Sequence, residues 1–179
     1  MRVVAGTLGG RRINAGGSET LRPTADRVRE AMFNSLYSLG AINDAVVLDL
    51  FAGSGALGIE ALSRGAARAV FVENDRQALT VLRGNLASLG LGGKATVVPA
   101  DGSSFLARAE PYDLLLLDPP YSFDCWPELL AHPTDSVVAI ESDREIDLPE
   151  TWDTHRVRRY GGTVVTLAFA PAARKAQVP

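Results

Sequence analysis

Residues 46–58 read Val-Val-Leu-Asp-Leu-Phe-Ala-Gly-Ser-Gly-Ala-Leu-Gly, and this stretch decides the fold. The apolar run 46–50 predicts a strand that is covered on both faces, as in a parallel sheet. Gly53 and Gly55 let the backbone turn sharply and approach a ligand closely, because no Cβ intervenes. Residues 56–64 then predict a helix. A strand, a glycine-rich turn and a helix in this order indicate a ligand-binding unit of an α/β protein.

Strands and helices continue to alternate after this unit. We predict strands over 69–73, 95–99, 114–117 and 137–141, with helices over 76–89 and 103–109. This alternation implies right-handed crossovers and a mostly parallel, doubly wound sheet. Gly161-Gly162 separates segments 156–160 and 163–170, which predicts a terminal hairpin that adds an antiparallel strand at or near the sheet edge. The tail, 171–179, has little to bury and is expected to be disordered.

Residues 1–40 form a different unit, an N-terminal extension of hairpin plus helix. Segments 3–5 and 12–13 flank Gly9-Gly10, which predicts a small β-hairpin. Thr24 is a candidate N-cap for a helix that runs to about Leu39. The expected organisation is therefore an extension over 1–40, a main domain over 41–170 and the tail.

The composition excludes several classes of protein. No run of about 18 apolar residues is present, so no transmembrane helix is expected, and the first residues lack the apolar core of a signal peptide. We therefore expect a cytoplasmic protein. Cys125 is the single cysteine, and only two histidines occur, so the sequence predicts neither an internal disulfide nor a metal cluster.

Arginine provides the basic charge of the extension. The first 40 residues contain six arginines against three acids, whereas the rest of the chain carries twelve basic and eighteen acidic side chains. The planar guanidinium suits phosphates and base edges, which makes this region a candidate nucleic-acid surface. A solvated basic face is the alternative, and the charge alone does not decide between the two.

The acids around the glycine turn bear on the cofactor. Gly53, Gly55 and the glycine at 58 fit the dinucleotide pattern G-x-G-x-x-G, and Glu73 follows Gly53 by twenty residues. A dinucleotide site, however, has its first glycine directly after the strand, whereas Asp49 and Phe51 precede this turn. An acid there suits a cofactor that carries a sulfonium and an ammonium group. Glu73 can accept both hydrogen bonds of a ribose diol, and Asp101 is either an adenine contact or a helix N-cap.

The strand at 114–117 ends in Asp118-Pro119-Pro120-Tyr121, at the rim where the glycine turn is expected. The Asp118 carboxylate and a proline carbonyl can accept the two N–H bonds of an exocyclic base amine, so that its lone pair faces a methyl donor. Prolines fix φ and remove competing N–H donors. Tyr121 offers a stacking face worth about 1–3 kcal/mol. Pro-Pro as a simple strand end is the alternative, but the shared rim favours methyl transfer to an amine.

These motifs together resemble the class I amino-methyltransferases, and more specifically the RsmD family of 16S rRNA guanine-N2 methyltransferases. The likeness covers most of the chain: segments 2–6 and 10–12, the stretch 21–34 with its Arg-Pro-Thr-x-Asp-Arg-Val-Arg-Glu marker, 47–66, 71–75 and 118–121. It implies a Rossmann-like fold with a seven-stranded sheet, and transfer of a methyl group from S-adenosyl-L-methionine to N2 of a guanine. The segment 122–136 is short, which predicts a truncated helix after the catalytic loop.

The resemblance also implies the site residues. The cofactor site comprises Asp49, Phe51, Gly53, Gly55, Glu73, Asn74, Asp101 and Gly102, and the catalytic element comprises Asp118, Pro119, Pro120 and Tyr121. The implied partner is 16S rRNA within a partly or fully assembled small ribosomal subunit, bound by a monomer through Arg11, Arg12, Arg22, Arg27 and Arg29.

Two other functions remain open from the sequence. One is methylation of a DNA base, at adenine N6 or cytosine N4, although DNA enzymes usually add a target-recognition domain for which this chain has no spare length. The other is a nucleotide-binding Rossmann oxidoreductase. Hydride transfer has no use for the Asp-Pro-Pro-Tyr element, which disfavours this third function.

Overall fold

The structure is a computed structural model that describes residues 1–16, 23–107, 111–132 and 136–171. A seven-stranded sheet forms its centre, with the strand order β3-β2-β1-β4-β5-β7-β6. The strands are β1 (Val46–Asp49), β2 (Arg68–Glu73), β3 (Ala95–Pro99), β4 (Leu114–Leu117), β5 (Val137–Ser142), β6 (Asp153–Tyr160) and β7 (Thr163–Phe169). The helices are η1 (Gly6–Leu8), α1 (Pro23–Ser38), α2 (Ala56–Ser63), α3 (Arg76–Ser88), α4 (Gly102–Leu106) and α5 (Trp126–Leu130).

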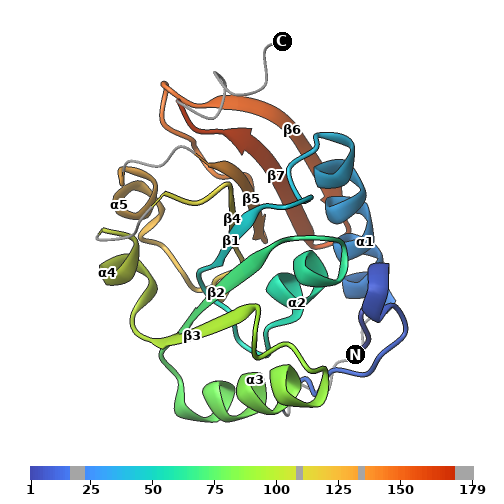
Figure 1. The fold of residues 1–179 in the computed structure, drawn as a ribbon. Helices are drawn as coiled ribbons and strands as arrows, with labels where there is room; N and C mark the ends of the chain where they lie inside the picture. Colours follow the sequence, from blue (N-terminus) through green and yellow to red (C-terminus); the bar gives the residue numbers. More distant parts are fainter. Residues whose placement is uncertain (17–22, 108–110, 133–135, 172–179) are drawn as a thin grey trace.

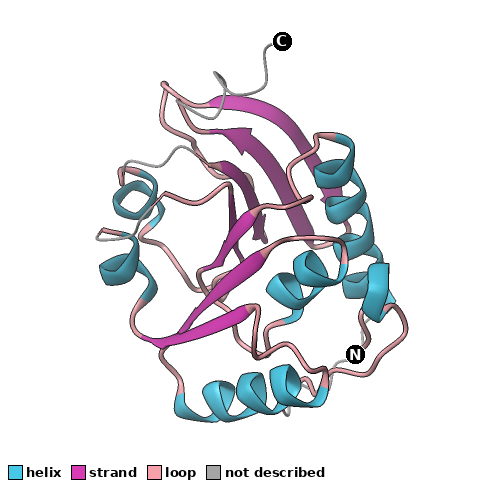
Figure 2. Ribbon diagram, in the orientation of Figure 1, coloured by secondary structure: helices cyan, strands magenta, loops and turns pink. Residues whose placement is uncertain are grey.

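Helices cover both faces of the sheet (Figures 1 and 2). On one face, α1, α2 and α3 pack through residues such as Phe33, Ile59 and Leu82. On the other face, α4 and α5 pack through Leu106 and Leu129. The β4 run of four leucines is fully buried because it lies in the middle of the sheet and meets both layers. The predicted α/β class and the sandwich of layers are confirmed.

The strand order reverses at β1, which pairs in parallel with β2 on one side and β4 on the other. The carboxyl ends of β1 and β4 thus diverge into helices on opposite sides, and such a switch point opens a crevice for ligands. The terminal hairpin is also confirmed: β7 inserts antiparallel between β5 and β6, which leaves β6 as an edge strand.

The N-terminal segment departs from the prediction. Instead of a regular hairpin, a single bridge joins Arg2 to Arg12, and the 3₁₀ turn η1 occupies the loop between them. Gly6 takes φ +80 there, and a Cβ would overlap the backbone of Ser63, so the loop fits tightly against α2. The helix α1 begins at Pro23 rather than at an N-cap on Thr24, because proline is preferred in the first helical turn.

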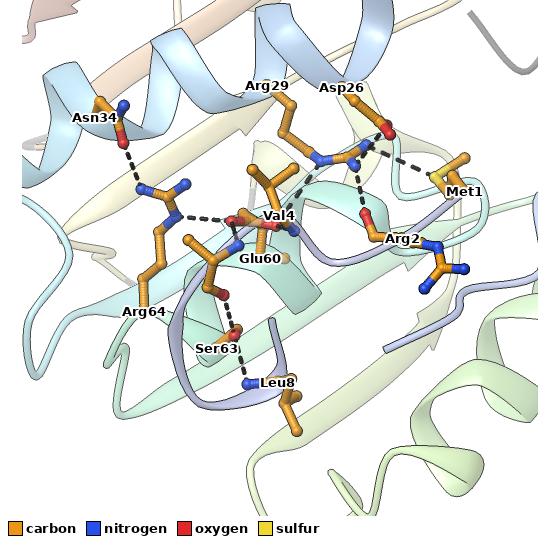
Figure 3. A network of polar contacts seen from close by, with 12 residues as sticks. Met1, Arg2, Val4, Leu8, Asp26, Arg29, Asn34, Glu60, Ser63 and Arg64 are labelled. Atoms are coloured by element: carbon orange, nitrogen blue, oxygen red, sulfur yellow. Dashed lines mark hydrogen bonds and ion pairs between the residues drawn. The ribbon is translucent and has the colours of Figure 1, made fainter. Parts of the chain in front are cut away.

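A buried carboxylate, Glu60 on α2, fastens this segment to the rest of the molecule (Figure 3). Its oxygens accept hydrogen bonds from the backbone N–H of Val4, at 2.7 Å, and of Ala5, at 3.0 Å. Arg64 donates to it at 2.7 Å, and Arg29 Nε lies 3.8 Å away. Two arginines and two amides therefore compensate one carboxylate that water does not reach.

No helix in the described part of the chain combines the length and the apolar character needed to cross a membrane.

Candidate functional site

A cavity of about 630 Å³ opens at the carboxyl ends of β1, β2, β4 and β5. One wall comes from the glycine turn and the strands beside it, through Phe51, Gly53, Glu73, Asn74 and Asp101. The opposite wall comes from the end of β4 and from β5, through residues 118–121, Phe123 and Glu141. The structure thus brings the glycine turn and the Asp-Pro-Pro-Tyr element to one crevice.

Glu73 organises the first wall. Its carboxylate accepts hydrogen bonds from the backbone N–H of Gly53, Asn74 and Asp75, each at 2.8 Å. These bonds hold the glycine turn against the start of α3 and leave the carboxylate on the cavity surface. A carboxylate has about four lone-pair sites and three of them are occupied here, so Glu73 can still accept one hydrogen bond from a ribose hydroxyl.

Asp101 caps α4, since its carboxylate accepts a hydrogen bond from Ser104 N at 2.9 Å. The N-cap interpretation of this residue is thereby confirmed. Asp101 is exposed and also lines the cavity. Its cap bond occupies one oxygen, and the other oxygen accepts no hydrogen bond from the described residues.

Three residues predicted to bind cofactor lie behind the wall instead of lining it. Asp49 is buried beneath the turn and accepts a hydrogen bond from Gly58 N at 2.8 Å. Gly55 takes φ +85, and a Cβ there would lie 2.5 Å from Leu82 Cδ1. Gly102 packs against Phe51, whose ring a Cβ would meet at 3.0 Å. These residues shape the wall from inside.

Burial raises the pKa of Asp49 to about 7, because desolvation disfavours the charged carboxylate. The hydrogen bond from Gly58 opposes this rise, and the nearby charge of Glu73 adds to it. A cation bound above the turn would therefore favour the charged form of the Asp49 carboxylate, and that charge would in turn attract the cation.

The Asp-Pro-Pro-Tyr element forms the second wall. Tyr121 is 46% exposed, and its hydroxyl lies 3.1 Å from Thr163 Oγ1, which fixes the ring at the cavity mouth. Burial raises the pKa of Asp118 well above its usual range, and the charges of Glu141 and Asp49 raise it further. Asp118 therefore holds a proton more readily than an exposed aspartate would.

Arg144, which the sequence analysis missed, clamps the chain after the prolines. Its guanidinium donates to Phe123 O at 3.1 Å and to the carboxylate of Asp124 at 2.6 Å. The ring of Phe123 in turn packs edge-on against Phe51 of the first wall, with centroids 5.4 Å apart. The two walls are thus in direct contact, and the short helix α5 follows immediately.

Glu141 is the second residue that the sequence analysis missed. It follows the pattern of Asp49, Glu73 and Asp118, since each is an acid at the carboxyl end of a parallel strand. Burial raises its pKa, and Arg29 opposes that rise. The signal was available in the sequence, but Glu141 was taken only as the end of a strand.

The arginines predicted to bind RNA fall into three groups. Arg11, Arg12 and Arg27 are exposed, and Arg22 lies outside the described residues. Arg29 is buried, at 5% exposure, and donates to Arg2 O and to the carboxylate of Asp26. Its assignment to an RNA surface is wrong, because its guanidinium points into the Glu60 network (Figure 3).

The chain is similar to a described protein family, to curated proteins and to solved structures. The family model described as "Conserved hypothetical protein 95" matches residues 1–169. The chain is 40% identical over 178 residues to Ribosomal RNA small subunit methyltransferase D of Escherichia coli K12, covering 93% of this chain and 88% of that protein. It is 38% identical to the putative rRNA methyltransferase YlbH of Bacillus subtilis, covering 84% and 87%. The solved structure of the putative methyltransferase yhhF from Escherichia coli superposes with a TM-score of 0.83 at 38% identity, covering 96% and 98%.

Proposed function

The chain belongs to the family described as "Conserved hypothetical protein 95", and from this premise we propose that it transfers a methyl group from S-adenosyl-L-methionine to N2 of a guanine in 16S rRNA. The observation that carries the proposal is the single cavity shared by the glycine turn and the Asp-Pro-Pro-Tyr element. A methyl donor on one wall and a base amine on the other can then meet without leaving the crevice.

The residues of the first wall fit this cofactor. S-adenosyl-L-methionine supplies a methyl group on a positively charged sulfur. The wall presents the acids Glu73 and Asp101 to the cavity and buries Asp49 beneath it, which suits the positive charge and the ribose and adenine hydrogen-bond donors. Gly53, with φ +52, leaves the space above the turn free of a side chain.

The residues of the second wall orient the acceptor. Asp118 and a carbonyl of the proline pair accept the two N–H bonds of the guanine amine, and Tyr121 stacks on the base. This arrangement directs the lone pair of the nitrogen across the cavity. The raised pKa of Asp118 makes it a better acceptor for the proton that the methylated nitrogen loses.

The partner we propose is 16S rRNA within a small ribosomal subunit, bound in the cytoplasm by one copy of the chain. The extension 1–40 supplies the arginines that reach phosphates: Arg11, Arg12 and Arg27, which are exposed, together with Arg22. The hydrogen bonds from Val4 and Ala5 to Glu60 attach the backbone of the N-terminal segment to α2.

The catalytic assignment is tested with Asp118→Ala and the matched control Glu128→Ala, an exposed acid on α5. Small subunits from cells that lack this protein are incubated with tritiated S-adenosyl-L-methionine, and the RNA is digested to nucleosides. We expect N2-methylguanosine with the wild type and the control, and none with Asp118→Ala. Binding of S-adenosylhomocysteine should survive, adding about 2.7 kcal/mol of stability at a hundred times its Kd. Loss of both binding and transfer would make Asp118 a structural residue, and stabilisation by NAD alone would overturn the cofactor.

The RNA surface is tested with Arg27→Ala against Arg68→Ala. Arg68 is an exposed arginine at the amino end of β2, the end of the strand away from the cavity. The logarithm of the RNA-binding constant falls linearly with the logarithm of the salt concentration. If Arg27 contacts a phosphate, its removal makes this negative slope shallower by about 1, and removal of Arg68 leaves the slope unchanged. Equal slopes for both variants would mean that Arg27 is a solvent-exposed residue of α1 that does not contact RNA.

A further inference from the structure

Glu141 is a carboxylate of the cavity that the mechanism above does not use. Leu117 of β4 pairs with Ile140 of β5, so Asp118 and Glu141 follow at the same level of two adjacent parallel strands. Side chains alternate along a strand, and Leu116 and Ala139 both join the core cluster on the face of α1 and α2. Asp118 and Glu141 therefore project toward that same face, side by side, into the cavity that both line.

The surroundings of Glu141 leave it ready to bind a ligand. Within the described residues its carboxylate accepts no hydrogen bond from the protein, although the side chain is mostly removed from water. The charge of Arg29, whose guanidinium is held by Asp26 and by Glu60, favours the charged form of Glu141. A desolvated acceptor of this kind gains most from a donor supplied by the ligand.

The base edge that supplies such a donor belongs to guanine. Beside its amine, guanine carries the N1–H donor, whereas adenine and cytosine carry an unprotonated ring nitrogen beside theirs. A carboxylate accepts from N1–H and repels a ring lone pair. Asp118 and the proline carbonyl already engage the amine, so the neighbouring acceptor on β5 meets the next position of the base.

We propose that Glu141 is the residue that selects guanine, by accepting a hydrogen bond from N1–H while Asp118 holds the amine. This inference rests on the proposed function and adds the origin of its base specificity. No bond to Glu141 forms or breaks during methyl transfer. As the amine nitrogen becomes positive in the transition state, N1–H becomes a stronger donor, so the contact also favours the reaction.

The test exchanges both partners of this contact. The target guanine, once mapped, is replaced in the RNA by 2-aminopurine, which keeps the 2-amino group but has an acceptor at N1. Glu141→Gln offers an amide N–H to that acceptor at almost unchanged volume. The wild type should lose on the order of a hundredfold in kcat/KM on 2-aminopurine, and Glu141→Gln should lose a similar factor on guanine. On 2-aminopurine, Glu141→Gln should equal or exceed the wild type.

Glu145→Gln, an exposed acid four residues later, is the matched control and should behave as the wild type on both bases. Stabilisation of Glu141→Gln by S-adenosylhomocysteine shows that the variant is folded. The inference is overturned if the kcat/KM of Glu141→Gln is lower than that of the wild type by the same factor on guanine and on 2-aminopurine. It is also overturned if the wild type methylates 2-aminopurine as fast as guanine. A failure of the proposed function looks different, because the wild type would then form no N2-methylguanosine at all.

Discussion

Replacement of Asp49 by asparagine should change how the stability of the protein depends on pH. Asp49 lies beneath the glycine turn, where its carboxylate accepts from Gly58 N at 2.8 Å and burial raises its pKa to about 7. Asparagine has nearly the same shape and keeps an oxygen for this hydrogen bond. It cannot ionise, so the variant isolates the contribution of the charge.

The sign and size of the effect follow from linkage. A pKa that is higher in the folded state means that the folded protein binds the proton more tightly than the unfolded chain. Stability from this group is therefore complete below the unfolded value of 3.8 and is lost as the pH rises to about 7. The interval between these two values corresponds to about 4 kcal/mol at most, at 1.36 kcal/mol for each pKa unit.

Urea unfolding of both proteins at a series of pH values between about 4 and about 8 measures this contribution. Because Asp118 and Glu141 also have raised pKa values, both proteins should lose stability over this range, and the wild type should lose more. The difference in unfolding free energy should grow in favour of the variant until about pH 7 and then level off. Parallel curves would refute the reasoning, since they would mean that Asp49 has the same pKa folded and unfolded.

Three further substitutions test other contacts. Glu60→Ala should lower the free energy of unfolding by about 3–5 kcal/mol, measured in urea, because the arginines and amides that bond to this carboxylate would lose their partner. Asn85→Ala should weaken S-adenosylhomocysteine binding in calorimetry, since Asn85 donates to Ser54 O in the glycine turn at 2.8 Å; an unchanged Kd would contradict this. Gly58→Ala should cost about 1–3 kcal/mol in thermal unfolding, because its Cβ would overlap the ring of Phe71, and a neutral result would show that the ring moves aside.

The central strands of the sheet could be predicted because their runs of apolar residues outweigh the other local signals in the sequence. The runs at 46–50 and 114–117 are too apolar to lie anywhere but in a covered sheet, and both became central strands. The crevice also followed from the sequence, since acids and glycines at the carboxyl ends of successive strands must share one rim in a parallel sheet.

Side-chain burial in the extension could not be predicted in the same way. Arg29 occupies a helix position beside the apolar stripe, and local sequence gives no sign that Glu60, 31 positions later, compensates its charge. The backbone of residues 4 and 5 likewise avoids a regular hairpin because its amides bond to that same carboxylate. These outcomes depend on contacts between distant parts of the chain, which neither periodicity nor turn chemistry encodes.

The attachment of the first residues to α2 and α3 has a consequence for synthesis of the protein. Val4 bonds to a residue 56 positions later, and Asn14 bonds to Asn85, 71 positions later. Val4 and Asn14 both leave the ribosome before their partners, and the partner of Asn14 on α3 follows later than the partner of Val4 on α2. Closure of such long loops slows folding. These contacts therefore form only after synthesis has passed α2 and then α3, and a chain that stops before α3 lacks the partner of Asn14.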